Sequence, residues 1–312
     1  MARSHSSRED VSLVQTLRQA LTFLRWRLKF GSDLVHLDDF LESLDWMAST
    51  YERLSGRRFA DSRAFEIGYG ARPIRLIALN SMGVNVCGID LDAPMIHFSV
   101  ARLFTIVKTN GPVRALKTAV RNLLFDRKDR EMLAKVLRAR GHALRIDEAR
   151  MLVGDAARFD FGERKFDLIY SFDVFEHIPP SDLEVLVSHI AASLTPDGIA
   201  VIVPSMYTGI TGGHLPEWFV HKVDEDTQRK TEPWEHLRKS RATADAYLNR
   251  WKRTDYRKLF SAYFEILEET DEFPELGKRW MTPAIREELG AWSDEDLYSN
   301  SVQFVLRVRQ VG

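Results

Sequence analysis

The chain has 312 residues, of which 45% are hydrophobic, 29% charged and 11% aromatic, and this composition is typical of a globular protein with a substantial core. Lys and Arg together number 44 and Asp and Glu 45, which excludes a histone-like polycation and wholesale disorder. The single cysteine, Cys87, cannot form an internal disulfide or a CxxC metal site. No run of eighteen apolar residues occurs, so we expect a cytoplasmic protein that does not span a membrane.

Leucines recur at helical spacing between residues 11 and 30, with basic residues between them. The pattern predicts a basic amphipathic helix. This helix either docks on the main domain or makes peripheral contact with a membrane. Phe23, Trp26 and Phe30 favour the membrane contact. With a second helix predicted at about 34–54, residues 1–60 are expected to form an N-terminal helical segment, followed by one domain over 61–312.

The periodicity of the sequence changes at Ala64. An apolar strand over 64–67 leads into a glycine turn, a helix over 74–79 and a second apolar strand over 84–90, which together begin a doubly wound α/β sheet. Later elements are predicted as strands at 150–153, 166–172, 199–203, 264–268 and 301–308, and as a helix at 182–194 that closes with a turn at 195–198. The last two strands are expected to pair at the sheet edge.

Two segments exceed this minimal pattern. Residues 97–150 predict two or three extra helices, broken at Gly111-Pro112 and at Gly141, and they carry 13 Lys or Arg against 5 Asp or Glu. The basic excess fits either solvated faces of lid helices or the capture of an anionic acceptor. Residues 206–260 are polar, contain Trp and His and are mostly non-periodic, which predicts a cap over the sheet edge.

The turn after the first strand points to a ligand that contains a nucleoside. Gly68 and Gly70 let the backbone approach a ligand closely, and the helix that follows presents free N–H groups. Asp90, at the end of the second strand, is placed to accept hydrogen bonds from ribose hydroxyls. Pro73 stands where a dinucleotide fingerprint has its third glycine, which disfavours NAD and an oxidoreductase. Glu66, at the end of the first strand, suits a cationic or amino-bearing group of the ligand.

Four motifs in order resemble those of class I S-adenosylmethionine-dependent methyltransferases. They are Phe65-Glu66-Ile67-Gly68-Tyr69-Gly70, Gly88-Ile89-Asp90-Leu91-Asp92, Gly154-Asp155-Ala156, and the stretch from Phe166 to Ile178. The stretch from Asp173 to His177 is similar to the branch that methylates small molecules, quinones and sugars. The resemblance implies an α/β, Rossmann-like sheet of seven strands with an antiparallel final strand and helices on both faces.

The resemblance also implies S-adenosylmethionine as cofactor and a set of residues that contact it. These are Glu66, Gly68 and Gly70 at the methionine part, Asp90 at the ribose hydroxyls, Leu91, Asp155 and Ala156 at the adenine, and Phe172 and Asp173 under the sulfonium. The sequence departs from the family at Arg72, where a small residue is usual, and at the long insertion after Asp92.

Methyl transfer requires an acceptor held in line with the methyl group and, for a hydroxyl, a base that removes the proton. His177 and His214 are the candidate bases, since histidine takes a proton near neutral pH. Asp173, Glu176 and His177 would share a helical face, and with His214 this set could bind Mg or Mn, resembling metal-assisted ribose methyltransferases that act on small-RNA ends. The alternative is a helix N-terminus in which Glu176 complements the dipole and His177 packs under the cap.

Aromatic residues of the cap are candidates for the acceptor pocket: Trp218, Phe219, Trp234 and His236, although plain packing is as common a use. The sequence as a whole predicts O-methylation of a small, possibly anionic molecule such as a sugar or a lipid-linked glycan. The alternatives are a metal-assisted RNA ribose methyltransferase and a non-catalytic interaction protein with the methyltransferase fold. No motif that reads or stacks nucleic-acid bases is present, so a nucleic-acid acceptor ranks lower.

Overall fold

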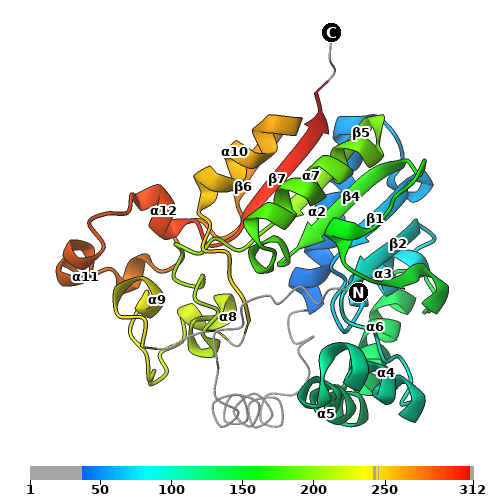
Figure 1. Ribbon diagram of the computed structural model, residues 1–312, viewed down its shortest axis with the longest axis horizontal. Coiled ribbons are helices and arrows are strands. Elements are labelled where there is room, and N and C mark those ends of the chain that lie inside the picture. Colours follow the sequence, from blue (N-terminus) through cyan, green and yellow to red (C-terminus); the bar gives the residue numbers. More distant parts are fainter. Residues whose placement is uncertain (1–36, 242–243, 245, 310–312) are drawn as a thin grey trace. The chain divides into compact units, whose positions relative to one another are not determined.

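The computed structural model describes residues 37–241, 244 and 246–309 (Figure 1). Seven strands form one sheet in the order β3-β2-β1-β4-β5-β7-β6. Their bounds are β1 Arg63–Ile67, β2 Asn85–Asp90, β3 Met151–Val153, β4 Phe166–Phe172, β5 Leu194–Val203, β6 Phe264–Asp271 and β7 Val302–Val308. The strands β1, β2, β3 and β4 pair in parallel, and β6 pairs antiparallel with β7, which confirms the predicted fold. The helix predicted over 11–30 lies outside the described residues.

Eleven named α-helices accompany these strands within the described ranges. They are α2 Leu37–Ser55, α3 Ile74–Ser81, α4 Val100–Asn110, α5 Pro112–Arg121, α6 Arg127–Ala139, α7 Pro180–Ser193, α8 Val220–Val223, α9 Glu235–Arg238, α10 Arg253–Tyr263, α11 Pro283–Glu288 and α12 Asp294–Tyr298. Short 3-10 turns join several of them. Nowhere in the described part of the chain does a helix have the length and apolar character needed to cross a bilayer.

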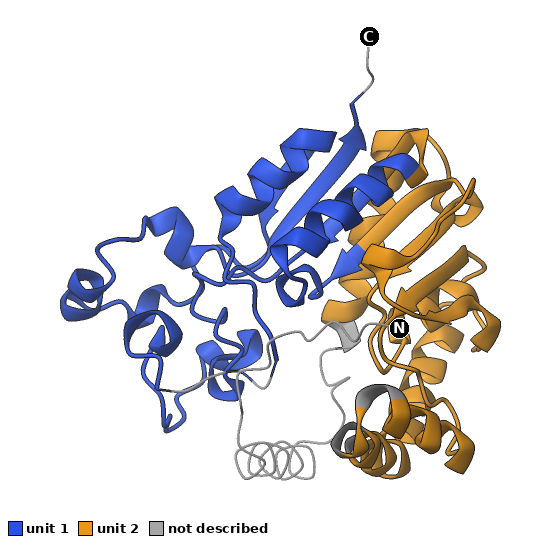
Figure 2. Cartoon of the chain, in the orientation of Figure 1, with its two compact units in different colours: residues 1–10, 171–192, 200–312 blue, residues 11–170, 193–199 orange. Residues whose placement is uncertain are grey.

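The chain divides into two compact units (Figure 2). Among the described residues, unit 1 comprises 171–192 and 200–309, and unit 2 comprises 37–170 and 193–199. The division follows the packing of the elements rather than the predicted boundary at residue 60, which stays a prediction. Each unit is described by itself below.

The core of unit 2 forms around β1. Phe65 is fully buried, and its ring centroid lies 5.2 Å from that of Phe161 and 5.0 Å from that of Phe166. A Cβ on Gly88 of β2 would come within 2.9 Å of the Glu66 carbonyl oxygen on β1 and 3.0 Å of the Leu76 side chain on α3. Glycine suits this position because a larger residue would clash with the backbone of the neighbouring strand.

The basic insertion forms three helices, and its breaks fall where glycine and proline predicted them. Helix α4 ends at Asn110, α5 starts at Pro112 and α6 ends at Ala139. A π-helical turn over Asn122–Asp126 joins α5 to α6. Helix α6 packs against α2 and α3 through a small apolar cluster around Leu41. The insertion is therefore an integral part of unit 2.

In unit 1, helix α10 covers the antiparallel pair β6 and β7. The rings of Phe260 on α10 and Phe304 on β7 are both buried, with centroids 5.0 Å apart. Residues 253–260 were expected in the cap, but they belong to this helix on the sheet. Strand β5 begins at Leu194 and so includes residues 195–198, where a turn was predicted.

The cap has an apolar core of its own, built from two segments far apart in the sequence. Its buried members are Ile210, Leu215, Trp218, Val223 and Trp234 from one segment, and Ile285, Leu289 and Leu297 from the other. The second segment lies between β6 and β7 and includes α11 and α12. We use the term cap below for residues 206–240 and 272–298. The sequence indicated only the first of these segments.

Candidate functional site

The glycine turn and the end of β2 are joined by one carboxylate in unit 2. Gly68 and Gly70 have φ angles of 79° and 70°, a conformation that glycine adopts at little cost. The Gly68 N–H donates to the Ile89 carbonyl at 2.8 Å. The Gly70 N–H donates to Asp90 Oδ2 at 2.7 Å, and the Asp92 N–H donates to Asp90 Oδ1 at 2.7 Å. Asp90 therefore fixes both loops relative to each other.

The loop after β3 lies beside these two. The Gly154 N–H donates to the Asp90 carbonyl at 2.8 Å, and the Asp155 carboxylate accepts from the Ala157 N–H at 3.0 Å and pairs with Arg158 at 2.7 Å. Leu91 is 65% exposed. Three consecutive parallel strands thus bring most of the predicted cofactor residues, Ala156 included, to the carboxyl edge of the sheet, where α/β proteins bind ligands.

Tyr69, between the two glycines, ties the glycine turn to β3. Its buried hydroxyl donates to the Leu152 carbonyl at 2.7 Å. Burial and the neighbouring Asp90 carboxylate raise its pKa, so the phenol keeps its proton and its donor role. Sequence reasoning missed this residue, and the only signal for it was its position within the glycine motif.

Glu66 is held inside unit 2 by partners of the same chain. Its carboxyl is 3% exposed, accepts a hydrogen bond from the Tyr170 hydroxyl at 3.2 Å and lies 4.0 Å from the Arg75 guanidinium. Burial raises the pKa of Glu66 to about 7, against the opposing effects of Arg75 and Tyr170. The sequence predicted a carboxylate facing the ligand, whereas the structure surrounds it with α3 and β4.

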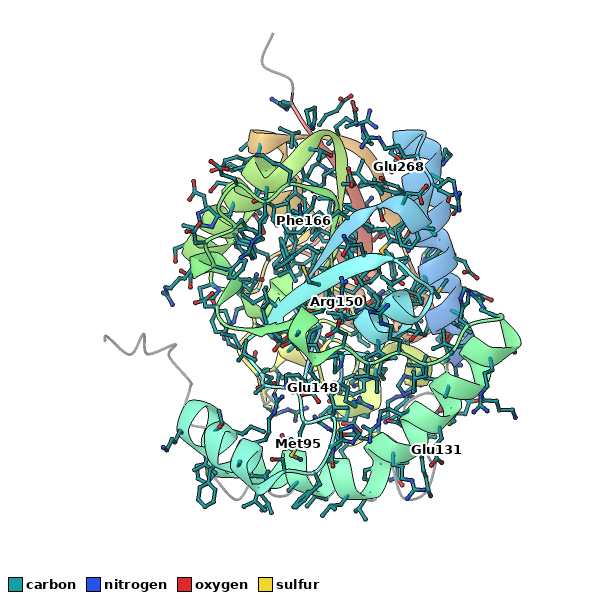
Figure 3. All side chains as sticks on the ribbon, turned by 90° about the vertical axis from the view of Figure 1, so that its right-hand side faces the viewer. Met95, Glu131, Glu148, Arg150, Phe166 and Glu268 are labelled. Carbon is teal, nitrogen blue, oxygen red and sulfur yellow. The ribbon has the colours of Figure 1, made fainter. Side chains whose placement is uncertain are left out.

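The insertion holds the far end of the glycine turn. Arg121 Nη2 donates to the Ala71 carbonyl at 3.1 Å, and Arg72 Nη1 pairs with the buried carboxylate of Asp129 at 3.1 Å. The Asn122 amide donates to the carbonyl of Met95 at 2.6 Å, beside the helices at the foot of Figure 3. Arg72, which departs from the family pattern, thus has its partner in the segment that is also unusual.

In unit 1, the chain after β4 does not form the helix that was expected. Asp173 has a φ of 55°, its N–H donates to the Val203 carbonyl at 2.9 Å, and its Oδ1 accepts from Ser205 Oγ at 3.2 Å. A 3-10 turn over Phe175–His177 follows. The Asn249 amide holds this turn by donating to the Phe175 carbonyl at 2.9 Å. The helical spacing predicted for Asp173, Glu176 and His177 is therefore absent.

Glu176 and the two candidate bases nevertheless meet in space. Glu176 Oε1 lies 3.8 Å from His177 Nε2 and 3.9 Å from His214 Nε2. The carboxyl is 3% exposed, and burial and the charge of Asp173 raise its pKa. Ser205 opposes that rise, yet no hydrogen bond of normal geometry reaches either carboxyl oxygen. The cluster joins a buried acid to two imidazoles.

The two imidazoles differ in what they can do. His177 Nδ1 lies 2.8 Å from the Tyr247 carbonyl oxygen, which only accepts, so Nδ1 carries the proton and Nε2 has a free lone pair. Burial, with His177 and His236 nearby, lowers the pKa of His214 to about 3. A base works best with a pKa near the operating pH, and so low a pKa disfavours His214 in that role.

The aromatic residues predicted to line an acceptor pocket are mainly structural. Trp218 and Trp234 are buried in the cap core. His236 is also buried, with Nε2 2.8 Å from the Tyr207 carbonyl. Phe219 is only partly buried, so it alone of the four has a surface to offer.

A hollow of about 870 Å³ lies elsewhere in unit 1. It is lined by α10, β6 and the end of β7, with Arg257 on one side and Glu268, labelled in Figure 3, on another. It contains none of the predicted site residues. Its walls mix acidic and basic groups along the sheet edge, and we assign it no role in the chemistry.

A family model described as a methyltransferase domain matches residues 40–269. A comparison with curated proteins finds no match. Similar solved structures include a protein from Pyrococcus horikoshii, 14% identical with a TM-score of 0.46, covering 91% of this chain and 99% of that one. A methyltransferase from Clostridium acetobutylicum is 13% identical with a TM-score of 0.43, over 95% and 100%. Magnesium protoporphyrin IX methyltransferase from Synechocystis is 15% identical with a TM-score of 0.45, over 95% and 98%.

Proposed function

The chain belongs to the methyltransferase-domain family as a class I S-adenosylmethionine-dependent enzyme, and on this premise we propose that it methylates a hydroxyl oxygen of a small molecule, such as a sugar or a lipid-linked glycan. The observation that carries the proposal is the clasp of Asp90 on the glycine turn and on its own loop. It holds two loop ends together at one edge of the parallel strands, where a nucleoside site of this fold class lies.

The residues of this edge fit the cofactor. The glycine turn leaves open backbone, since a side chain on Gly70 would meet nothing closer than 4.0 Å. An ionised carboxylate has about four lone-pair sites, so Asp90 can accept from ribose hydroxyls while it holds its two backbone donors. Leu91 offers exposed apolar surface for the adenine. The bound cofactor would supply the electrophilic methyl group of its sulfonium.

The histidine cluster of unit 1 would serve the acceptor. As the methyl–oxygen bond forms, the hydroxyl must lose its proton. The lone pair on His177 Nε2 is available either to take that proton or to bind a cation that acidifies the hydroxyl. In either case the Tyr247 carbonyl fixes the tautomer and the direction of the ring.

The proposal is tested by binding and product identification. We expect the purified chain to bind S-adenosylhomocysteine in calorimetry and to transfer labelled methyl from S-adenosylmethionine to a small hydroxyl compound in a host extract. Label found in RNA would replace the small-molecule acceptor with a nucleic-acid one. Absence of S-adenosylhomocysteine binding would overturn the proposal and favour the non-catalytic interaction protein.

A further inference from the structure

The carboxyl of Glu176 lacks the partners that a buried acid needs. Both of its oxygens are inaccessible and without a hydrogen bond, although buried polar groups in proteins are nearly always satisfied. Leaving such a group unpaired costs free energy, and far more when it is ionised. The site is therefore incomplete as the protein chain alone builds it, and either a cation or a hydrogen-bonding group would complete it.

The neighbours of Glu176 select a cation. The ligand atoms of Glu176, His177 and His214 all lie within 4.8 Å of one another, close enough for one ion to reach all three. The Tyr247 carbonyl orients His177 so that its Nε2 lone pair is free, which is the outer-shell arrangement of histidines that bind metals.

We propose that Glu176, His177 and His214 hold a divalent first-row transition metal such as Zn²⁺ or Mn²⁺. Two imidazoles and one carboxylate suit these ions, whereas Mg²⁺ and Ca²⁺ prefer oxygen ligands alone. Three protein ligands leave a coordination position open for water or a substrate oxygen. This inference rests on the proposed function for its role only: the metal would bind the acceptor hydroxyl and lower its pKa, and His177 would then be a ligand rather than the base.

Metal binding is tested on the full chain with Co²⁺ and Zn²⁺. We expect one equivalent of Co²⁺ to give visible absorption bands, and Zn²⁺ to displace it. Because loss of an outer-shell partner alone costs about 10- to 100-fold in affinity, Glu176→Gln and His214→Ala should each lose roughly 100-fold or more. His221→Ala, which changes an exposed histidine of the same unit, is the matched control and should bind as the wild type does.

Two outcomes would overturn the site: a metal-free wild type that takes up neither ion, or unchanged affinity in both variants. Thermal unfolding of each variant without metal shows that it is folded. S-Adenosylhomocysteine binding, measured in the same proteins, separates this inference from the proposed function. Asp90→Ala should bind S-adenosylhomocysteine more weakly and keep its metal affinity, whereas His214→Ala should bind the metal more weakly and keep its affinity for S-adenosylhomocysteine.

A second observation concerns the surface of the insertion in unit 2. Val100, Phe104 and Val107 recur at helical spacing on α4 and are between 40% and 66% exposed. Leu116 on α5 and Leu123 on the π-helical turn are also exposed. Helices α4 and α5 pack side by side (Figure 1), so the hairpin presents an unusual amount of apolar surface to solvent.

The charge of the α4–α5 hairpin indicates which partner covers its apolar surface. Residues 100–121 contain five Lys or Arg and no Asp or Glu. A second copy of the chain would bring like charges together in a two-fold contact. The segment 11–30, with four basic and no acidic residues, would be repelled in the same way. Arg102 and Arg121 pair with Glu148 and Asp126 outside the segment. The segment itself remains basic, and exposed apolar groups on a basic hairpin match the interface of an anionic bilayer.

We infer that the α4–α5 hairpin binds the surface of an anionic membrane. The wild type should co-sediment with vesicles that contain phosphatidylglycerol, less at high salt, and stay in solution with pure phosphatidylcholine. Phe104→Ser with Leu123→Ser should abolish sedimentation, whereas Val185→Ser, which changes an exposed residue of α7, should not. The inference would be overturned if the wild type sedimented with neither kind of vesicle. It would also be overturned if the wild type self-associated and Phe104→Ser abolished that self-association.

Discussion

The carboxyl groups of the two candidate sites differ in whether the chain itself supplies their hydrogen-bond partners. In unit 2, Asp90 accepts two backbone N–H groups and Glu66 accepts the Tyr170 hydroxyl. In unit 1, Glu176 is as buried as Glu66, but its carboxyl oxygens have no hydrogen bond. The first region is complete without a ligand, and the second is not. The proposed cofactor edge is thus preorganised by the chain, whereas the histidine cluster leaves a buried acid that the proposed metal would satisfy.

The largest expected effect is the pH dependence of stability that Glu66 causes, because its carboxyl titrates even though Tyr170 and Arg75 stabilise it. Its pKa of about 7 lies above the usual 4.5, so the folded protein holds the proton more tightly than the unfolded chain. The resulting stability is present at low pH and is lost as pH rises from 4.5 to 7, by roughly 3 kcal/mol. Urea unfolding of wild type and Glu66→Gln should show this slope in the wild type only. Parallel slopes in the two proteins would contradict the assignment.

Asp90→Ala removes the clasp on both loops. We expect the free energy of S-adenosylhomocysteine binding to fall by about 1 to 3 kcal/mol, since charge-assisted hydrogen bonds are lost. Calorimetry measures this, and Asp61→Ala, at an exposed acid of unit 2, is the control. If Asp90→Ala bound with wild-type affinity, the cofactor edge would have to lie elsewhere.

Tyr69→Phe tests how far the cofactor edge depends on a single neutral hydrogen bond. The variant loses the bond to the Leu152 carbonyl and should be less stable by about 1 kcal/mol. Thermal unfolding measures the change, and cofactor affinity should fall in the same variant because the glycine turn is no longer tied to β3. If Tyr69→Phe lowered stability but left the affinity for the cofactor unchanged, the glycine turn would not be part of the cofactor site.

Arg140→Ala provides the baseline for both regions. Arg140, which caps the C-terminus of α6, makes two hydrogen bonds of 2.8 Å to Asp45 on α2, but both side chains are substantially exposed. Such pairs contribute about 0.2 to 1 kcal/mol, and neither metal nor cofactor binding should change. If urea unfolding showed that Arg140→Ala loses more free energy of unfolding than Tyr69→Phe, the anchoring of the insertion, and not the buried acids, would dominate the stability of unit 2.

Sequence patterns correctly predicted those elements whose structure depends on residues close in the sequence. The strand over 166–172 was predicted at its observed bounds because its apolar run is buried by its own neighbours. The glycine turn was predictable because Gly68 and Gly70 are needed for positive φ. Asp173 could not be predicted in the same way: its left-handed backbone is held by Val203 and Ser205, which come thirty residues later.

Long-range packing accounts for the remaining differences. Residues 272–298 join the cap only because β6 and β7 bring their ends to residues 206–240, and no pattern within either segment records that. The burial of Glu176 likewise depends on Asn249, whose amide fixes the turn from a loop seventy residues away. His177 and His214 were both expected to act as bases, but only the structure shows that burial makes His214 a weak one.

The two-segment cap also gives the protein an intrinsic fluorescent probe. Four of the seven tryptophans, Trp218, Trp234, Trp280 and Trp292, belong to the cap cluster. The Arg229 guanidinium lies 4.5 Å from the ring centroid of Trp218 and 4.4 Å from that of Trp280. Intrinsic fluorescence should therefore follow the cap far more than the sheet, so that an emission change on adding acceptor or metal would reveal cap rearrangement without any attached label.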